Sequence, residues 1–203
     1  MMATTHVLAG IALASVALFT IPELAPVAVV AAALGGLAPD LDLYLGHRKT
    51  LHFPVYLPLL VVPAVLAVAL APSAVTVAAG YFLLAAAVHS MMDAFGGGLE
   101  LRPWLGTSKR AVYDHFNGRW IAPHRGVRYD GSPEDLALAG VLALPGLLLF
   151  EPPVPTVVGA VLAVSAVYTL LRKRMVRVAE WFVGQLPASV LARVPDRFVE
   201  DLA

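Results

Sequence analysis

Six long apolar segments, separated by short breaks, constrain the fold of this chain more than any other feature. They cover about residues 7 to 21, 25 to 39, 53 to 71, 74 to 95, 136 to 150 and 154 to 171. A helix that crosses a bilayer needs roughly 20 predominantly apolar residues, and lipid admits only helices and closed barrels. Proline at the breaks and abundant Ala and Gly within the segments favour closely packed helices. The sequence therefore predicts an all-α fold, a polytopic membrane helix bundle of about six apolar helices, with four to six as the range.

The composition agrees with a protein that is embedded in lipid. The 203 residues are 59% hydrophobic and only 14% charged, whereas soluble domains carry about 25% charged residues. The formal net charge of zero gives no indication of nucleic-acid binding. Cysteine is absent, which excludes disulfides, thiolate metal ligands and a thiol nucleophile. No Lys or Arg precedes the first apolar segment, so we expect this segment to be retained and not cleaved as a signal peptide.

The distribution of basic residues predicts the orientation of the helices. The connections 40–52 and 96–133, together with the tail from residue 172, contain all 14 Lys and Arg residues. The intervening turns near residues 22, 72 and 152 contain none. By the positive-inside rule, we expect the basic connections and both termini to be cytoplasmic, in a multi-pass protein of the cell's inner membrane. The expected organisation is a membrane-embedded domain 1–171, which includes the loop 96–133, and a cytoplasmic tail 172–203.

Two regions have a composition typical of the membrane surface. The loop 96–133 interleaves aromatic and basic residues, which suits the lipid headgroup layer. The glycines 96–98 would let this loop fold over a neighbouring site as a lid, although a helix C-terminal break explains them equally well. In the tail, five apolar residues follow helical spacing: Met175, Val178, Ala179, Phe182 and Leu186. This stripe predicts an interfacial amphipathic helix, with a dimer contact as the alternative.

Ionisable side chains gather at those ends of the first four apolar segments that the topology places on one membrane face. They are His6, Asp40, Asp42, His52, His89 and Asp93. Helical bundles build metal centres from ligands that face one another at a common level. On a helix, the spacing of four residues makes His89 and Asp93 point the same way. Because ionisable groups are costly in apolar segments unless they are paired or metal-bound, the sequence predicts a metal site at this face.

Each of these residues also has a simpler interpretation. His89 and Asp93 could form an intrahelical polar pair, Asp40 and Asp42 could end a helix at the interface, and His52 could be an interfacial histidine. His6 could simply be the polar residue that commonly precedes a first helix. The convergence of all of them on one face favours the metal site.

Other polar residues are expected to have ordinary roles. His47, His115 and His124 lie in loops, where a solvated histidine is the default. Ser132 as N-cap, with Pro133 and Asp135 in the first turn, predicts the start of the fifth helix.

The order and spacing of several stretches resemble the YdjM-type family of membrane-bound, predicted metal-dependent hydrolases. The resemblance covers roughly the first half of the chain and is carried by His6, the stretch 36–42, the stretch 47–54, and His89 with Asp93. That family is distantly similar to the zinc-dependent phospholipase C and P1 nuclease group, whose all-helical members cut phosphoester bonds with a cluster of zinc ions. The resemblance implies that the metal ligands are His6, Asp40, Asp42, His52, His89 and Asp93. This chain has a single His-x3-Asp pair, so we expect one or two ions instead of three.

The implied activity is metal-assisted hydrolysis of a phosphoester, with a phospholipid that reaches the site through the bilayer as one such substrate. For nitrogen and carboxylate ligands, zinc is the expected ion, with manganese or iron as alternatives. The expected catalytic residues are Asp40 and Asp42, one as base or as the partner that orients a ligand histidine, and Arg48, which would neutralise a substrate phosphate. Two alternatives stay open: a transporter that binds a cation in passage, and a structural membrane protein with a stabilising metal.

Overall fold

The structure is a computed structural model that describes residues 1–187 together with residues 190 and 193. These residues are mostly helical, so the expected all-α class is confirmed. The α-helices are α1 (Ala3–Ala14), α2 (Ala17–Thr20), α3 (Ala25–Leu37), α4 (Leu43–Gly46), α5 (Tyr56–Leu70), α6 (Ala74–Met92), α7 (Pro133–Leu148) and α8 (Val154–Gly184). Four 3-10 helices extend or connect them in the described part: η1 (Pro22–Leu24), η2 (Ala38–Asp42), η3 (Asp93–Phe95) and η4 (Pro103–Leu105). Strands β1 (Val112–Asp114) and β2 (Arg119–Ile121) form a hairpin.

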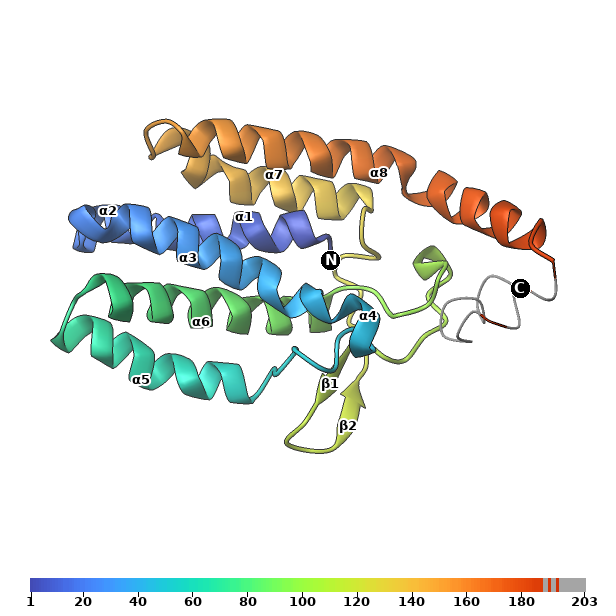
Figure 1. The fold of residues 1–203 in the computed structure, drawn as a ribbon, viewed down its shortest axis with the longest axis horizontal. Coiled ribbons are helices and arrows are strands. Elements are labelled where there is room, and N and C mark those ends of the chain that lie inside the picture. Colours follow the sequence, from blue (N-terminus) through green and yellow to red (C-terminus); the bar gives the residue numbers. More distant parts are fainter. Residues whose placement is uncertain (188–189, 191–192, 194–203) are drawn as a thin grey trace.

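The longer helices lie side by side along the long axis of the molecule, and their connections gather at two ends (Figure 1). Helix α1 packs against α3, α6, α7 and α8, so it occupies the centre of the bundle. The N-terminus, α4, the hairpin and the start of α7 lie at one end. The turns α2–α3, α5–α6 and α7–α8 lie at the other. The helix ends that carry the predicted ligands therefore meet at the first of these two ends of the bundle.

Small residues let α1, α3 and α6 approach closely. The buried core between them is rich in alanine and includes Ala28 and Ala32, both fully buried. A Cβ atom on Gly10 would collide with the backbone carbonyl of Ala32, and one on Gly36 would collide with that of His6. Such contacts are typical of helix pairs that lack large side chains at the interface. They fix α1 against α3 close to the predicted site.

Within the part of the chain that the structure describes, four helical segments are long and apolar enough to cross a membrane, which indicates a membrane protein. They are Ala3–Thr20, Pro22–Asp42, Ala74–Phe95 and Val154–Gly184. Helix α5 is also apolar but has only 15 residues. Large apolar side chains on its surface, such as Leu59, Val62 and Leu66, are exposed, as expected for a helix that faces lipid.

The predicted start of α7 is confirmed. Ser132 is the N-cap residue, Pro133 occupies the first turn, and the Ser132 Oγ accepts a hydrogen bond from Asp135 N at 3.2 Å. The Asp135 carboxylate in turn accepts hydrogen bonds from Thr5 Oγ1 (2.7 Å) and Met2 N (2.8 Å). These contacts join the start of α7 to the start of α1.

The loop 96–133 contains a feature that the sequence did not reveal, the β1–β2 hairpin. Tyr113 pairs with Trp120 across its strands, and their rings meet edge to face with centroids 5.4 Å apart. Its turn contains Asn117 followed by Gly118 with φ +65°, a combination that favours hairpin turns. Aromatic residues that we expect at the lipid headgroup layer thus also stabilise a local fold.

Helix α8 is longer than expected. The sequence predicted an apolar helix that ends at residue 171 and a separate amphipathic helix in the tail, whereas one helix runs from Val154 to Gly184. No Pro or Gly interrupts residues 160–183, and Leu, Arg, Lys and Met among them favour helix. Within the predicted stripe, Met175, Val178 and Phe182 are exposed. Arg197 and the rest of the tail beyond residue 193 lie outside the described residues.

Candidate metal centre

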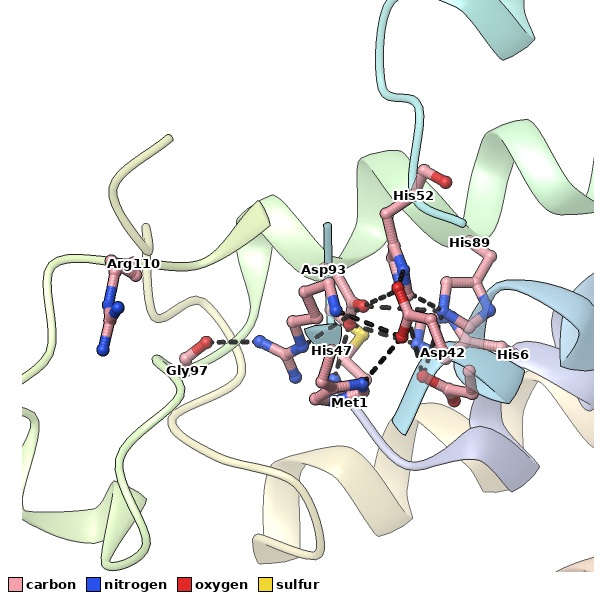
Figure 2. Close-up of polar contacts among 12 residues, drawn as sticks. Met1, His6, Asp42, His47, His52, His89, Asp93, Gly97 and Arg110 are labelled. Atoms are coloured by element: carbon pink, nitrogen blue, oxygen red, sulfur yellow. Dashed lines mark hydrogen bonds and ion pairs between the residues drawn. The ribbon is translucent and has the colours of Figure 1, made fainter. Parts of the chain in front are cut away.

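The predicted ligands come from five separate segments that meet at one end of the bundle. His6 lies in α1, Asp40 and Asp42 in η2, and His89 in the last turn of α6. Asp93 begins η3, and the segment between α4 and α5 contributes His47, Arg48 and His52. Figure 2 shows the side chains of His52, His89 and Asp93 pointing toward a common centre, with His6 and Asp42 beside them.

Four side-chain atoms converge with the spacing of ligands around one ion. Asp40, His52, His89 and Asp93 each offer one nitrogen or oxygen, and these four atoms lie within 4.8 Å of one another. His52 Nε2 is 3.1 Å from His89 Nε2 and 3.2 Å from Asp93 Oδ2. His89 Nε2 is 3.5 Å from both Asp93 Oδ2 and Asp40 Oδ1, and His52 Nε2 is 3.9 Å from Asp40 Oδ1. Ligands at about 2.0–2.1 Å from a tetrahedral ion are separated by roughly 3.3 Å. These four atoms, called the four-atom group below, could therefore bind a metal ion.

The hydrogen bonds of the two histidines direct their lone pairs at the same centre. His89 Nδ1 lies 2.6 Å from the carbonyl oxygen of Gly36, which can only accept, so Nδ1 is the protonated nitrogen. His52 Nδ1 lies 3.0 Å from Asp42 Oδ2 and is assigned as a donor for the same reason. In the neutral rings both Nε2 atoms are therefore acceptors, and they face two carboxylate oxygens. Four mutually facing acceptors are unfavourable without a cation or added protons.

Asp42 holds the segment that carries His52. Its Oδ1 accepts from His47 Nδ1 (3.1 Å) and Arg48 N (3.2 Å), and its Oδ2 accepts from Leu51 N (3.1 Å) and His52 Nδ1 (3.0 Å). The side chain is fully buried and lies outside the four-atom group. Carboxylates that accept from a ligand histidine in this way fix its tautomer and ring orientation. The sequence left open which of Asp40 and Asp42 would orient a histidine, and the geometry gives that contact to Asp42.

His6 lies beside the four-atom group. Its ring stacks on that of His89 with centroids 3.6 Å apart, and its Nε2 is 3.2 Å from Asp93 Oδ1. Its Nδ1 is buried and has no hydrogen-bond partner among the described residues. The α-amino group of Met1 also contacts Asp93 Oδ1, at 2.8 Å. Asp93 thus directs one oxygen to the four-atom group and the other to His6.

Arg48 is close to the predicted ligands Asp42 and His52 in sequence, and its side chain also contacts the centre in space. Its side chain is buried, its Nη1 donates to Gly97 O at 2.8 Å, and its Nε lies 3.4 Å from Asp93 Oδ2. The backbone of Arg48 has φ 58°, a conformation that is uncommon for a residue with a side chain. The contacts with Asp42 and Gly97 hold this conformation and direct the guanidinium toward the carboxylate.

The electrostatics of the centre favour a positive charge on His52 when no metal is present. Burial by itself would lower the pKa of this histidine, but hydrogen bonds to the carboxylates of Asp42 and Asp93 outweigh it, so the pKa is raised above 6.5. A metal ion would replace that proton, because it needs the neutral ring.

Three of the four residues in the four-atom group are buried, and Asp40 is partly exposed. His52, His89 and Asp93 are at most 1% exposed, whereas the side chain of Asp40 is 16% exposed. Asp40 and Arg48 line a cavity of about 620 Å³. An ion held by the four-atom group would therefore be reached through the Asp40 side.

The structure also places the histidines that were expected to be solvated. His47 contacts Asp42 and so supports the centre. The sequence spacing between these two residues did not indicate this contact. His115 Nε2 bonds to Lys49 O (2.7 Å) and His124 Nδ1 to Ala94 O (3.0 Å), and neither belongs to the four-atom group. The carbonyl of Gly36, which orients His89, could not be found from side-chain types at all.

Comparisons of the chain with protein-family models, with curated proteins and with solved structures return no match, so the centre is interpreted from its own geometry.

Proposed function

We propose that this protein is a membrane-embedded, metal-dependent hydrolase whose centre faces the cytoplasm and acts on a phosphoester. The observation that carries the proposal is the group of four converging acceptor atoms, three of them buried and the fourth on a cavity. A catalytic zinc ion keeps a coordination position for water; here water would reach the ion on the Asp40 side, as a fifth ligand or in exchange for the Asp40 oxygen. A purely structural site would be closed on all sides.

The donor set supports zinc, because two imidazole nitrogens and two carboxylate oxygens suit this ion. Manganese or iron would also accept these ligands. When bound, such an ion would lower the pKa of a water molecule from about 15.7 to roughly 7 and so supply hydroxide at neutral pH. His6 and Asp93 extend the donor set, because Asp93 has its two oxygens on different partners. His6 Nε2 and this second oxygen of Asp93, Oδ1, would be the donors for a second ion.

The remaining residues of the centre have separate roles in this proposal. Asp40 is the ligand on the cavity side, so it would hold the ion next to the place where water and substrate arrive. Asp42 orients His52 by accepting a hydrogen bond from its Nδ1. Its carboxylate accepts four hydrogen bonds in all, which leaves it poorly suited to act as a base. Arg48 lines the cavity and would offset negative charge on a substrate phosphate.

The position of the centre supports an enzyme over a transporter. Among the described residues, the buried charged and histidine side chains all belong to the end of the bundle that holds the N-terminus. A transport site near the bilayer midplane would require polar groups farther along the helices. The Lys and Arg residues of the described part lie at the same end, and this supports a bundle of six helices with that end in the cytoplasm.

The test is the metal content of the detergent-purified protein, measured by inductively coupled plasma mass spectrometry beside turnover of simple phosphoesters. His89→Ala removes one of the four acceptor atoms, and His115→Ala is the matched control, since His115 is a hydrogen-bonded loop histidine outside the group. We expect metal and turnover in the wild type and in His115→Ala, and neither in His89→Ala. Undiminished turnover without metal, or equal metal in all three proteins, would refute the proposal.

A further inference from the structure

We infer that the substrate is an amphiphile, a phosphoester with a long acyl or alkyl chain that enters sideways from the bilayer. This inference rests on the proposed function and adds the substrate class. The observations that support it are the position, lining and rim of the cavity of about 620 Å³ beside the metal centre.

The cavity lies between the end of α3 and the side of α8. Leu37, Leu41 and Leu43 line it from α3 and the segment after α3, and Val164 and Tyr168 line it from α8. Residues at the start of α1 and in the segment 98–101 also line it. Figure 1 shows that the C-terminal end of α3 and the middle of α8 lie on opposite sides of the N-terminus.

The mouth of the cavity is apolar and belongs to helices that can cross a membrane. Leu37, Leu41, Leu43 and Val164 line the cavity and are also exposed, so they form its rim. Leu37, Leu41 and Val164 belong to two of the segments that are long and apolar enough to span a bilayer. A mouth with such a rim opens toward lipid chains, where a polar solute is scarce and an amphiphile is abundant.

Part of the cavity lining is polar and belongs to the metal centre. Asp40 presents the accessible side of the four-atom group there, and the buried guanidinium of Arg48 supplies positive charge. Arg172 also lines the cavity, but its Nε donates to Asp130 at 2.8 Å, whereas the Nε of Arg48 lies 3.4 Å from Asp93 Oδ2 and has no hydrogen-bond partner among the described residues. An anionic phosphoester group is therefore best accommodated beside Asp40 and Arg48, with the chain directed to the rim.

The size of the cavity agrees with this occupant. Pockets for small ligands hold roughly 300–1,000 Å³, and this cavity is well inside that range. It can enclose a phosphate group and the first part of a chain, while the rest of the chain stays among the lipids. A small soluble phosphoester would leave the apolar walls without contacts.

The experiment measures binding separately from turnover. The probe is a long-chain alkyl phosphonate that carries a photoreactive diazirine on its chain; a phosphonate cannot be hydrolysed at its P–C bond. Protein in a phosphate-free maltoside detergent is irradiated with the probe, and the labelled peptides are identified by mass spectrometry. Decylphosphonate and methylphosphonate serve as competitors with the same head and different chains.

Two variants of α8 form a matched pair. Val164→Trp places a bulky ring at the rim, and Val167→Trp places it one turn away on the same helix, outside the cavity lining. The two valines are similarly exposed, at 58% and 54%. We expect labelling of the α3–η2 segment and α8 in the wild type and in Val167→Trp, and its loss in Val164→Trp. Each buried methylene group favours binding. Decylphosphonate should therefore compete at a concentration at least about tenfold lower than that of methylphosphonate.

Turnover is then measured with decyl and methyl 4-nitrophenyl phosphate. Water attacks phosphorus, the bond to the aryl oxygen breaks, 4-nitrophenolate leaves with the electron pair, and the protons of water pass to the protein and the solvent. Preference for the decyl ester that Val164→Trp abolishes supports the inference. Equal labelling in both variants, or equal use of the two esters, overturns the inference and leaves the hydrolase intact. Specific labelling without any turnover overturns only the hydrolase.

Discussion

Replacing Asp42 by Asn tests how the centre is held together. The two side chains have almost the same size, but Asn has one acceptor oxygen where Asp has two. In the protein the two oxygens of Asp42 accept from four N–H donors, two each. The amide NH₂ group of Asn must therefore face one pair of donors: either His52 and Leu51, or His47 and the backbone of Arg48.

Both orientations weaken the metal site. If the amide nitrogen faces His52, the ring can no longer donate from Nδ1, and the tautomer that presents the Nε2 lone pair is disfavoured. If it faces His47 and Arg48, the segment that carries His52 loses two of its supports. Loss of such a supporting carboxylate typically reduces metal affinity about 10- to 100-fold, which is roughly 1.4 to 2.8 kcal/mol.

The assay is competition for Zn²⁺ between the purified protein and a chromophoric chelator at neutral pH. Asp114→Asn is the control, because Asp114 also accepts several hydrogen bonds, from Phe116 N, Asn117 N and Asn117 Nδ2, but lies in the hairpin. Its metal affinity should equal that of the wild type. Asp40→Asn removes one of the four converging acceptors and should weaken metal binding more than Asp42→Asn does.

Two results would refute this reasoning. Unchanged affinity in Asp42→Asn would show that the orientation of His52 does not depend on the carboxylate. Complete loss of metal in Asp42→Asn, together with normal binding in Asp40→Asn, would make Asp42 the ligand and reverse the roles of the two residues.

Three further predictions concern packing, pH and helix capping. Gly36→Ala adds a Cβ that collides with the His6 carbonyl, so it should lower the free energy of unfolding by about 1–3 kcal/mol; wild-type stability in denaturant titrations would contradict this. The raised pKa of His52 means that its protonated form stabilises the metal-free protein below pH 6.5 and that this contribution is lost as pH rises through the raised pKa. Because metal needs the neutral ring, the increase in melting temperature caused by Zn²⁺ should grow with pH, and a pH-independent increase would exclude this competition. Ser132→Ala removes the N-cap bond to Asp135 N and should cost about 1 kcal/mol of stability with unchanged zinc affinity; a large loss of zinc would show that the start of α7 also shapes the centre.

The helical elements of this protein follow closely from its sequence. Most residues of the predicted apolar segments lie in helices, although the first segment is divided between α1 and α2, and the N-cap at Ser132 begins α7 as predicted. These features depend on local hydrophobicity and on the capping of backbone N–H groups, both of which are present in a short stretch of chain. The β1–β2 hairpin was missed because its aromatic and basic residues are equally typical of a membrane surface. The end of the sixth helix was misplaced because a change from apolar to amphipathic composition does not by itself interrupt a helix.

The sequence by itself determined which residue types reach one end of the bundle: the six ionisable residues at the ends of the first four apolar segments. Only the tertiary structure decided which of their atoms converge. It brings Asp40, His52, His89 and Asp93 together, turns Asp42 toward His52, places His6 against the other oxygen of Asp93, and opens the cavity on the Asp40 side. The physical reason is that spacing along a helix fixes the direction of a side chain only within that helix. The rotation and approach of one helix relative to another depend on close backbone contacts such as that between Gly36 and His6, which form only when the helices pack.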